Sequence, residues 1–166
     1  GLHIGLAIGI SKSTKMDFII QKAVELGVVN IAPLFTEHSQ IKLKESRLQN
    51  KMQRWETIIN SACEQSGRSL IPKLSLPVNF ITWLQNFKGM GVLLDSQGDF
   101  SPNNIPKPSE NLNILVGPEG GLSEFEKKEA KKYGLMSMRL GPRIMRTETA
   151  PIAAISVFQS LWGDFN

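Results

Sequence analysis

Cysteine and histidine are scarce in this sequence of 166 residues. The single cysteine, Cys63, excludes an internal disulfide framework and any zinc site built from several cysteines. Two histidines, His3 and His38, are too few for a histidine-based metal cluster, so we expect no bound metal.

Long apolar runs and phosphate-binding motifs are also missing. No apolar stretch approaches the roughly 18 residues of a membrane span, and no signal-peptide pattern opens the chain. The sequence contains neither a Gly-Lys-Ser/Thr Walker loop nor a dinucleotide-binding fingerprint, which argues against a generic nucleotide-binding enzyme. We expect a single globular domain in the cytoplasm, with no membrane partner.

Net charge discriminates less between functions. Nineteen Lys and Arg stand against fifteen Asp and Glu, which gives a formal charge of +4 and a pI near 9.3. This surplus suits a nucleic-acid partner, but proteins with small-molecule partners carry it too. A basic run at Lys42, Lys44, Arg47, Lys51 and Arg54 is either a solvated helix face or a phosphate-binding surface.

Apolar strands alternate with amphipathic helices along the chain. Residues 2–10 form a nearly continuous apolar run, which is typical of a strand buried on both faces. The next helix is expected to have Thr14 as its N-cap and Gly27 at its end. Further strands are expected at 28–35, 70–78, 91–95, 113–116 and 135–140, with helices beginning at Ser46, Phe80, Ser123 and Pro151 and an exposed loop at 96–111. The alternation predicts an α/β domain with a mainly parallel sheet flanked by helices.

Two unusual loops follow strands of this sheet, where parallel α/β proteins bind their ligands. The first, 117–121, reads Gly-Pro-Glu-Gly-Gly and precedes a helix with a Ser-x-x-Glu capping box at 123–126. Its glycines let the backbone approach a ligand closely, and the helix start offers free N–H groups. An ordinary tight strand-to-helix turn is the alternative interpretation.

The second loop, 140–150, reads Leu-Gly-Pro-Arg-Ile-Met-Arg-Thr-Glu-Thr-Ala. Arg143 and Arg146 stand beside an apolar Ile-Met pair, a pattern that predicts a pocket with an apolar wall and a charged rim. Alternatively, Thr149 caps the following helix and the arginines around it are solvated.

These segments resemble the signature of the 16S rRNA uracil-N3 methyltransferases, which belong to the SPOUT superfamily. The similarity covers essentially the whole chain in motif order. It is carried by 115–123 with Glu126, by 140–150, by 21–28, by Ala-Cys-Glu-Gln-Ser-Gly-Arg at 62–68, and by Gln159, Gly163 and Asp164. His38 departs from the arginine common in the family, and Met145 replaces the usual leucine, a swap of similar volume.

The resemblance implies one methyltransferase domain over residues 1–166, a trefoil knot in its C-terminal half, a homodimer, and S-adenosyl-L-methionine as methyl donor. It implies methylation of N3 of a uridine in 16S rRNA, so that this RNA or the small ribosomal subunit is the partner. The family usually carries an N-terminal β-barrel domain that helps to hold RNA, and we expect that domain to be absent, because strand-like sequence begins directly after Gly1. The alternative is a cofactor-binding RNA-interaction module, inactive without the barrel.

The two loops and the resemblance together assign the site residues. The donor is expected to contact Leu94, Gly117, Pro118, Glu119, Gly120, Gly121, Leu140, Gly141, Ile144, Met145 and Thr147. Arg146 is expected to stabilise an enolate-like uracil anion or to hold a phosphate. Glu148 is either the base that takes the N3 proton or an ion-pair partner of Arg143 or Arg146. Arg68 and Arg143 are expected to contact RNA. For Arg68 the alternatives are a contact with the partner subunit and a cation that complements the dipole at a helix C-terminus.

Overall fold

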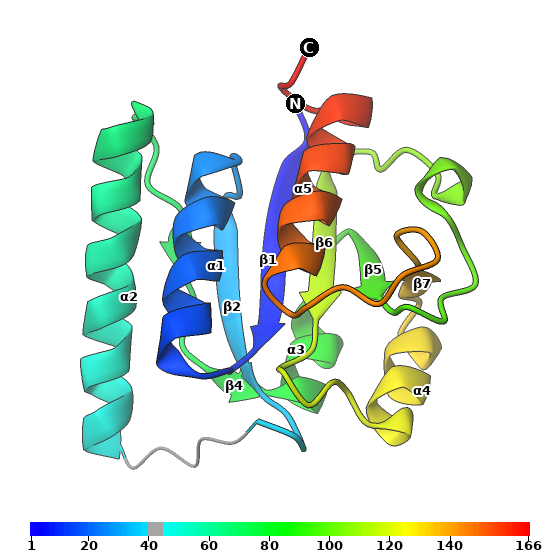
Figure 1. Ribbon diagram of the computed structural model, residues 1–166, viewed down its shortest axis with the longest axis horizontal. Helices are drawn as coiled ribbons and strands as arrows, with labels where there is room; N and C mark the ends of the chain where they lie inside the picture. Colours follow the sequence, from blue (N-terminus) through cyan, green and yellow to red (C-terminus); the bar gives the residue numbers. More distant parts are fainter. Residues whose placement is uncertain (40–44) are drawn as a thin grey trace.

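The computed structural model describes residues 1–39 and 45–166. Its strands are β1 (His3–Gly9), β2 (Asn30–Phe35), β3 (Lys73–Leu74), β4 (Val78–Asn79), β5 (Met90–Leu94), β6 (Asn111–Val116) and β7 (Met136–Met138). They form one sheet in the order β3-β2-β1-β6-β5-β7, with β4 paired to the end of β2 (Figure 1). Every described strand pair is parallel, so the predicted sheet is confirmed.

Helices cover both faces of this sheet. Helices α1 (Ser13–Glu25) and α5 (Thr149–Trp162) lie on one face with α2 (Glu45–Ser66) outside α1, and α3 (Phe80–Asn86) and α4 (Glu124–Lys132) lie on the other (Figure 1). Trp55 and Phe158 are buried in the larger core, and Phe80 and Leu84 in the smaller one. Because β1 is covered on both sides, its sequence is almost wholly apolar. Within the described ranges, no helix has the length and apolar character of a membrane span.

The predicted starts of α1 and α2 are wrong. Helix α1 has Lys12, not Thr14, at its N-cap, and no side chain caps it. The backbone N–H of Lys12 donates instead to the carboxylate of Glu119, 3.2 Å away, so a contact from a distant loop fixes this helix start. Helix α2 is already helical at Glu45, which places Ser46 inside it.

The start of α5 and two loop predictions also need correction. Helix α5 begins at Thr149, with Glu148 at the N-cap position, so Pro151 lies within the first turn and Thr149 is not the cap. The stretch expected as one strand at 70–78 is divided into β3 and β4, and its two prolines each remove a ladder donor. The loop at 96–111 is not wholly exposed, because Ile105 packs into the larger core.

Two members of the basic run join α2 to α1. Arg54 donates to the carboxylate of Asp17 with an Nε–Oδ2 distance of 2.9 Å, and this hydrogen bond and the charge of Asp17 raise the pKa of Arg54. The ammonium group of Lys51 contacts the hydroxyl of Ser13. Lys42 and Lys44 lie outside the described residues, and phosphate binding by the run stays a prediction.

The segment that follows β5 packs tightly along β7. The N–H of Phe100 donates to the carbonyl of Ser137 at 3.0 Å, and the N–H of Arg139 donates to the carbonyl of Phe100 at 2.9 Å. A Cβ atom on Gly98 would lie only 2.6 Å from the carbonyl carbon of Met138, so the two backbones touch. This packing positions the chain that leaves β7 towards α5. The trefoil knot implied by the resemblance stays a prediction.

The predicted capping box of α4 is present. The Ser123 hydroxyl accepts from the Glu126 N–H at 3.1 Å, and the Glu126 carboxylate accepts from the Ser123 N–H at 2.9 Å and from the Glu37 N–H at 3.2 Å. We expect Ser123→Ala to lower the free energy of unfolding by about 1 kcal/mol, because one N–H of the first turn loses its acceptor. Urea unfolding measures this, with Ser160→Ala on the exposed side of α5 as the control. Equal midpoints for the two variants would contradict the prediction.

Candidate donor-binding site

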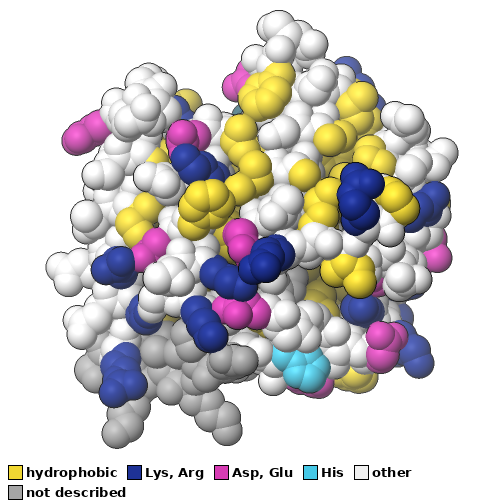
Figure 2. Space-filling view, viewed as in Figure 1, with side chains coloured by type: hydrophobic (Ala, Val, Ile, Leu, Met, Phe, Trp, Pro, Cys, Tyr) yellow, Lys and Arg dark blue, Asp and Glu magenta, His cyan; other side chains and the backbone are white. Residues whose placement is uncertain are grey.

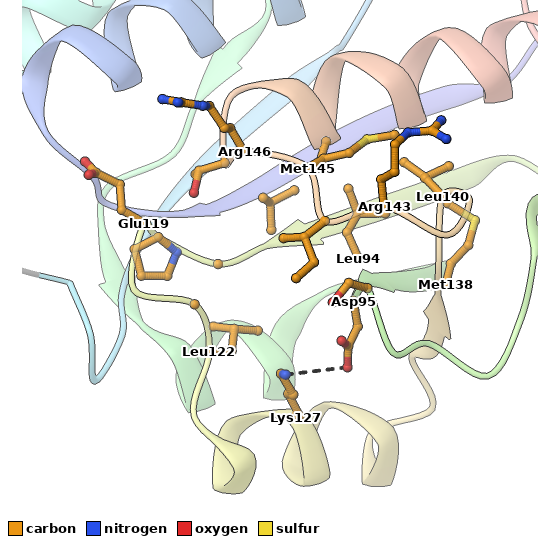
Figure 3. Close-up of a pocket in the computed structure, with 18 residues that line it drawn as sticks. Leu94, Asp95, Glu119, Leu122, Lys127, Met138, Leu140, Arg143, Met145 and Arg146 are labelled. Atoms are coloured by element: carbon orange, nitrogen blue, oxygen red, sulfur yellow. Dashed lines mark ion pairs between the residues drawn. The ribbon is translucent and has the colours of Figure 1, made fainter.

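A pocket opens at the carboxyl ends of β5, β6 and β7, where the sequence predicted a ligand site (Figure 3). Its walls come from the end of β5, the loop between β6 and α4, and the loop between β7 and α5. The lining residues are Leu94, Asp95, Ser96, Val116, Gly117, Pro118, Glu119, Gly121, Leu122, Lys127, Met138, Leu140, Arg143, Ile144, Met145, Arg146, Thr147 and Ala150. Three segments distant in sequence thus form one cavity.

The β6–α4 loop is packed so closely that its backbone forms part of the pocket wall. A Cβ atom on Gly117 would lie 2.9 Å from the backbone nitrogen of Leu122 and 3.1 Å from the carbonyl carbon of Gly121. Gly121 has a φ of 76°, in the left-handed region that favours glycine. The glycines of this loop therefore serve backbone geometry, and they leave room for a ligand against the main chain.

The β7–α5 loop supplies an apolar wall and two arginines. Ile144 is 84% exposed, although it is a large apolar side chain, and it lines the pocket next to Met145. Arg143 and Arg146 also line the pocket (Figure 3). The N–H groups of Thr149 and Ala150 donate to the carbonyl of Arg146, so Arg146 is tied to the first turn of α5. This arrangement matches the predicted apolar wall with a charged rim.

An ion-pair group joins both loops to α1. The Lys15 ammonium lies 3.5 Å from Oε2 of Glu119 and 3.7 Å from Oε2 of Glu148. Burial raises the pKa of Glu119, but the hydrogen bond from the Lys12 N–H and the charges of Lys15 and Lys12 outweigh it, so the net pKa is lowered. The ion pair described for Glu148 is with Lys15 rather than with either arginine.

A second ion pair lies at the opposite side of the pocket. Nζ of Lys127, on α4, is 3.6 Å from Oδ2 of Asp95 at the end of β5 (Figure 3). The Asp95 side chain is only 10% exposed, and its Oδ1 accepts from the N–H of Gln97. This pair fixes the turn after β5 at the pocket floor.

Most of the predicted donor-binding residues line this pocket. Gly120 and Gly141 do not: Gly120 lies against His38, and Gly141 takes a left-handed φ of 76° in the turn after β7. Glu148 also stands behind the wall, at Lys15. All three assignments stay predictions.

Of the two predicted RNA contacts, only Arg143 is at the pocket. Arg68 lies elsewhere and donates to the carbonyls of Val24 and Val28 at 2.9 and 2.8 Å. It therefore binds one carbonyl in the last turn of α1 and one in the segment between α1 and β2, and its contact with RNA stays a prediction.

Sequence reasoning missed seven lining residues: Asp95, Ser96, Val116, Leu122, Lys127, Met138 and Ala150. Asp95 ends an expected strand and Ser96 follows it directly, so the rule that ligands bind at carboxyl ends of strands was the signal for them. Lys127 carried no such signal, because only the packing of α4 brings it to Asp95.

A family model described as RNA methyltransferase domain matches residues 1–159. The chain belongs to this family. It is 40% identical over 166 residues to the ribosomal RNA small subunit methyltransferase E of Buchnera aphidicola, a match that covers 99% of this chain and 66% of the relative. The Bacillus subtilis protein of the same name is 34% identical over 166 residues, with 93% of this chain and 64% of the relative covered. The chain spans about two thirds of the length of these RNA methyltransferase relatives.

Solved structures of relatives share the fold. A ribosomal RNA small subunit methyltransferase E from Neisseria gonorrhoeae, bound to S-adenosyl methionine, matches with a TM-score of 0.93 and 38% identity, over 99% of this chain and 68% of that one. A Legionella pneumophila protein in complex with the same cofactor matches with a TM-score of 0.92 and 39% identity. The match covers 96% of this chain and 66% of that one. The SpoU methyltransferase AviRb from Streptomyces viridochromogenes shares the fold with a TM-score of 0.59. It is 18% identical, over 97% of this chain and 61% of that one. The SPOUT fold expected of this RNA methyltransferase domain is confirmed.

Proposed function

We propose that this chain binds S-adenosylmethionine in the pocket between the three loops and transfers its methyl group to ribosomal RNA. The observation that carries the proposal is the pocket itself, which lies in a fold shared at a TM-score of 0.93 with a relative solved with this donor bound. The curated relatives are named as small-subunit rRNA methyltransferases. Because ribosomal RNA is the proposed substrate, we also propose that the protein acts in the cytoplasm.

The residues present fit such a donor. Gly117 allows the close packing of the β6–α4 loop that forms one wall of the pocket, since a Cβ there would meet backbone atoms of the loop. Leu94, Leu140 and Ile144 offer apolar contacts for a flat base, and backbone N–H and C=O groups can read its polar edges. When bound, the donor supplies an electrophilic methyl group on a sulfonium sulfur. The chain's contribution is to hold donor and acceptor in line, where proximity and orientation provide most of the rate gain.

The finer proposal is that the acceptor atom is N3 of a uridine in 16S rRNA. N3 carries a proton, so methylation at this atom also requires a group on the protein, or solvent, that accepts this proton. Arg146 lines the pocket and is exposed, and we propose that its guanidinium stabilises the negative charge that develops on the uracil. Glu148 is the candidate base, or it serves only through its ion pair with Lys15.

RNA contacts and self-association complete the proposal. Arg143 lies at the pocket mouth, suited to a phosphate. The proposed homodimer uses the apolar end of the chain, where Leu161 is 42% and Phe165 is 49% exposed. Figure 2 shows apolar side chains near this end and a mixed group of basic and acidic side chains near the centre of the same face.

The test has two arms. In calorimetry the chain is expected to bind S-adenosylmethionine with one site per chain. With a radiolabelled methyl donor, it is expected to transfer label to 16S rRNA in small ribosomal subunits, at a uridine N3 when the RNA is mapped. Donor binding without transfer would favour the RNA-interaction module instead, and absence of donor binding by the folded chain would refute both.

A further inference from the structure

Lys15 occupies an unusual place between the two glycine-bearing loops of the pocket. It sits in the first turn of α1, directly after β1, and its ammonium faces Oε2 of Glu119 at 3.5 Å and Oε2 of Glu148 at 3.7 Å. Glu119 belongs to the β6–α4 loop and Glu148 to the end of the β7–α5 loop. The ammonium group of Lys15 thus connects two loops that are distant in sequence and lie close together only in the folded chain.

The partial burial of the two carboxylates makes a nearby positive charge favourable. The three side chains are largely covered, with 29% of Lys15, 22% of Glu119 and 24% of Glu148 exposed. Oε2 of Glu148 is fully buried and accepts no hydrogen bond from any described residue. Two carboxylates turned to one point repel each other, and a covered carboxylate without a compensating charge is costly. The ammonium of Lys15 removes both costs at once.

The direct neighbours of these carboxylates form the pocket wall. Pro118, beside Glu119, and Thr147, beside Glu148, both line the cavity. The position of each carboxylate is therefore coupled through one peptide bond to a residue of the pocket wall. The carboxylate of Glu119 is held a second time by the N–H of Lys12, so Glu148 depends more on Lys15 than Glu119 does.

We propose that Lys15 is a positioning residue of this site, which holds the β6–α4 and β7–α5 loops in one arrangement through Glu119 and Glu148 and so preforms the donor pocket. The inference rests on the proposed function, since it assigns Lys15 to the binding of the same donor. Lys15 does not itself line the pocket, so it acts through the two loops. Fixing a pocket in advance raises affinity because less ordering is left for the ligand to cause.

Several other titratable groups lie near the three residues. Lys12 and His38 share a small cavity with Glu119, Arg146 lies on the same side of the donor pocket as Glu119, and Lys51 from α2 reaches Ser13 beside Lys15 (Figure 3). The positive charges of Lys12, Arg146 and Lys51 remain near the two carboxylates after Lys15 is replaced. The pKa of Glu119 would nevertheless rise in a Lys15 variant, because a close positive charge is lost.

The experiment compares Lys15→Met, Lys15→Arg and Lys22→Met. Lys22→Met is a matched control, because Lys22 lies on the same helix, is 35% exposed and pairs with Glu25 at 2.9 Å, away from the pocket. Calorimetry with S-adenosylmethionine is expected to show about a tenfold loss of affinity for Lys15→Met, in the range known for residues that act without touching the ligand. Lys15→Arg is expected to recover most of the loss, and Lys22→Met to match the parent.

A pH series separates positioning from simple stability. Glu119 has a lowered pKa, so its ionised form is retained as the pH falls and is lost only when the pH reaches that lowered value. In Lys15→Met the change of donor affinity that accompanies protonation of Glu119 is expected at a higher pH than in the parent and in Lys22→Met, because the pKa of Glu119 rises when the charge of Lys15 is lost. Thermal unfolding of each variant, measured without donor, checks that all remain folded.

The outcomes distinguish the two proposals. If the parent chain binds the donor and folded Lys15→Met binds it equally well with the same pH profile, the role of Lys15 is refuted. If Lys15→Arg is as weak as Lys15→Met, the shared charge is not the cause and the inference also fails. Failure of the parent itself to bind S-adenosylmethionine would instead refute the proposed function.

Discussion

Replacing Arg146 with alanine is expected to lower methyl transfer at saturating donor by about 10²–10³-fold, as removal of one group that stabilises developing negative charge does. Arg146 lines the pocket and forms no ion pair with any carboxylate of the described residues, so its charge is not neutralised within them. Its backbone is held by the first turn of α5, which fixes where its side chain leaves the main chain. Donor affinity is expected to change little, because the group acts on the acceptor base.

Arg143→Ala is the matched comparison, since Arg143 has the same charge and lines the same pocket from the same loop. A phosphate contact holds RNA without taking part in the reaction, so this variant is expected to raise KM for the RNA and to leave kcat nearly unchanged. Steady-state kinetics with varied RNA give KM and kcat for both variants, single-turnover rates give the rate of methyl transfer, and calorimetry gives the donor affinity. If Arg146→Ala loses donor binding and keeps its rate at saturating donor, Arg146 belongs to the donor site.

The sequence was a good guide to the pocket's two loops. A strand that runs into Gly-Pro-Glu-Gly-Gly and then into a capping box has few ways to fold, and Gly121 and Ser123 adopt the expected geometries. The loop after β7 was found from composition, because arginines beside an apolar pair are unusual between buried elements. Each of these two patterns lies within a short stretch of sequence, so it could be interpreted without knowing the order of the strands in the sheet.

The ion-pair group around Lys15 had no such local signal. Lys15, Glu119 and Glu148 lie far apart in sequence, and only the pairing of β1 with β6 brings the start of α1 beside the β6–α4 loop. Strand order depends on packing of the whole sheet rather than on the periodicity of any one segment. The same cause explains the misplaced start of α1, because the Glu119 carboxylate, and not a capping side chain, receives the N–H of Lys12.

The second large effect is expected at Gly117. Replacing Gly117 with valine is expected to reduce donor affinity by more than about tenfold, equivalent to about 1.4 kcal/mol. Even the Cβ of alanine would lie 2.9 Å from the backbone nitrogen of Leu122 and 3.1 Å from the carbonyl carbon of Gly121, and neither backbone atom can turn away as a flexible side chain can. The loop must therefore shift, and it forms one wall of the pocket.

Gly120→Val is the matched control within the same loop. A Cβ on Gly120 would lie 3.0 Å from Cβ of His38, on the side that faces away from the pocket lining, so a smaller loss of affinity is expected. Calorimetry with S-adenosylmethionine gives the affinities, and circular dichroism shows whether each variant keeps its helices and sheet. Equal affinities for folded Gly117→Val and the parent would mean that the β6–α4 backbone does not touch the donor. A larger loss at Gly120 than at Gly117 would place the donor on the His38 side of the loop.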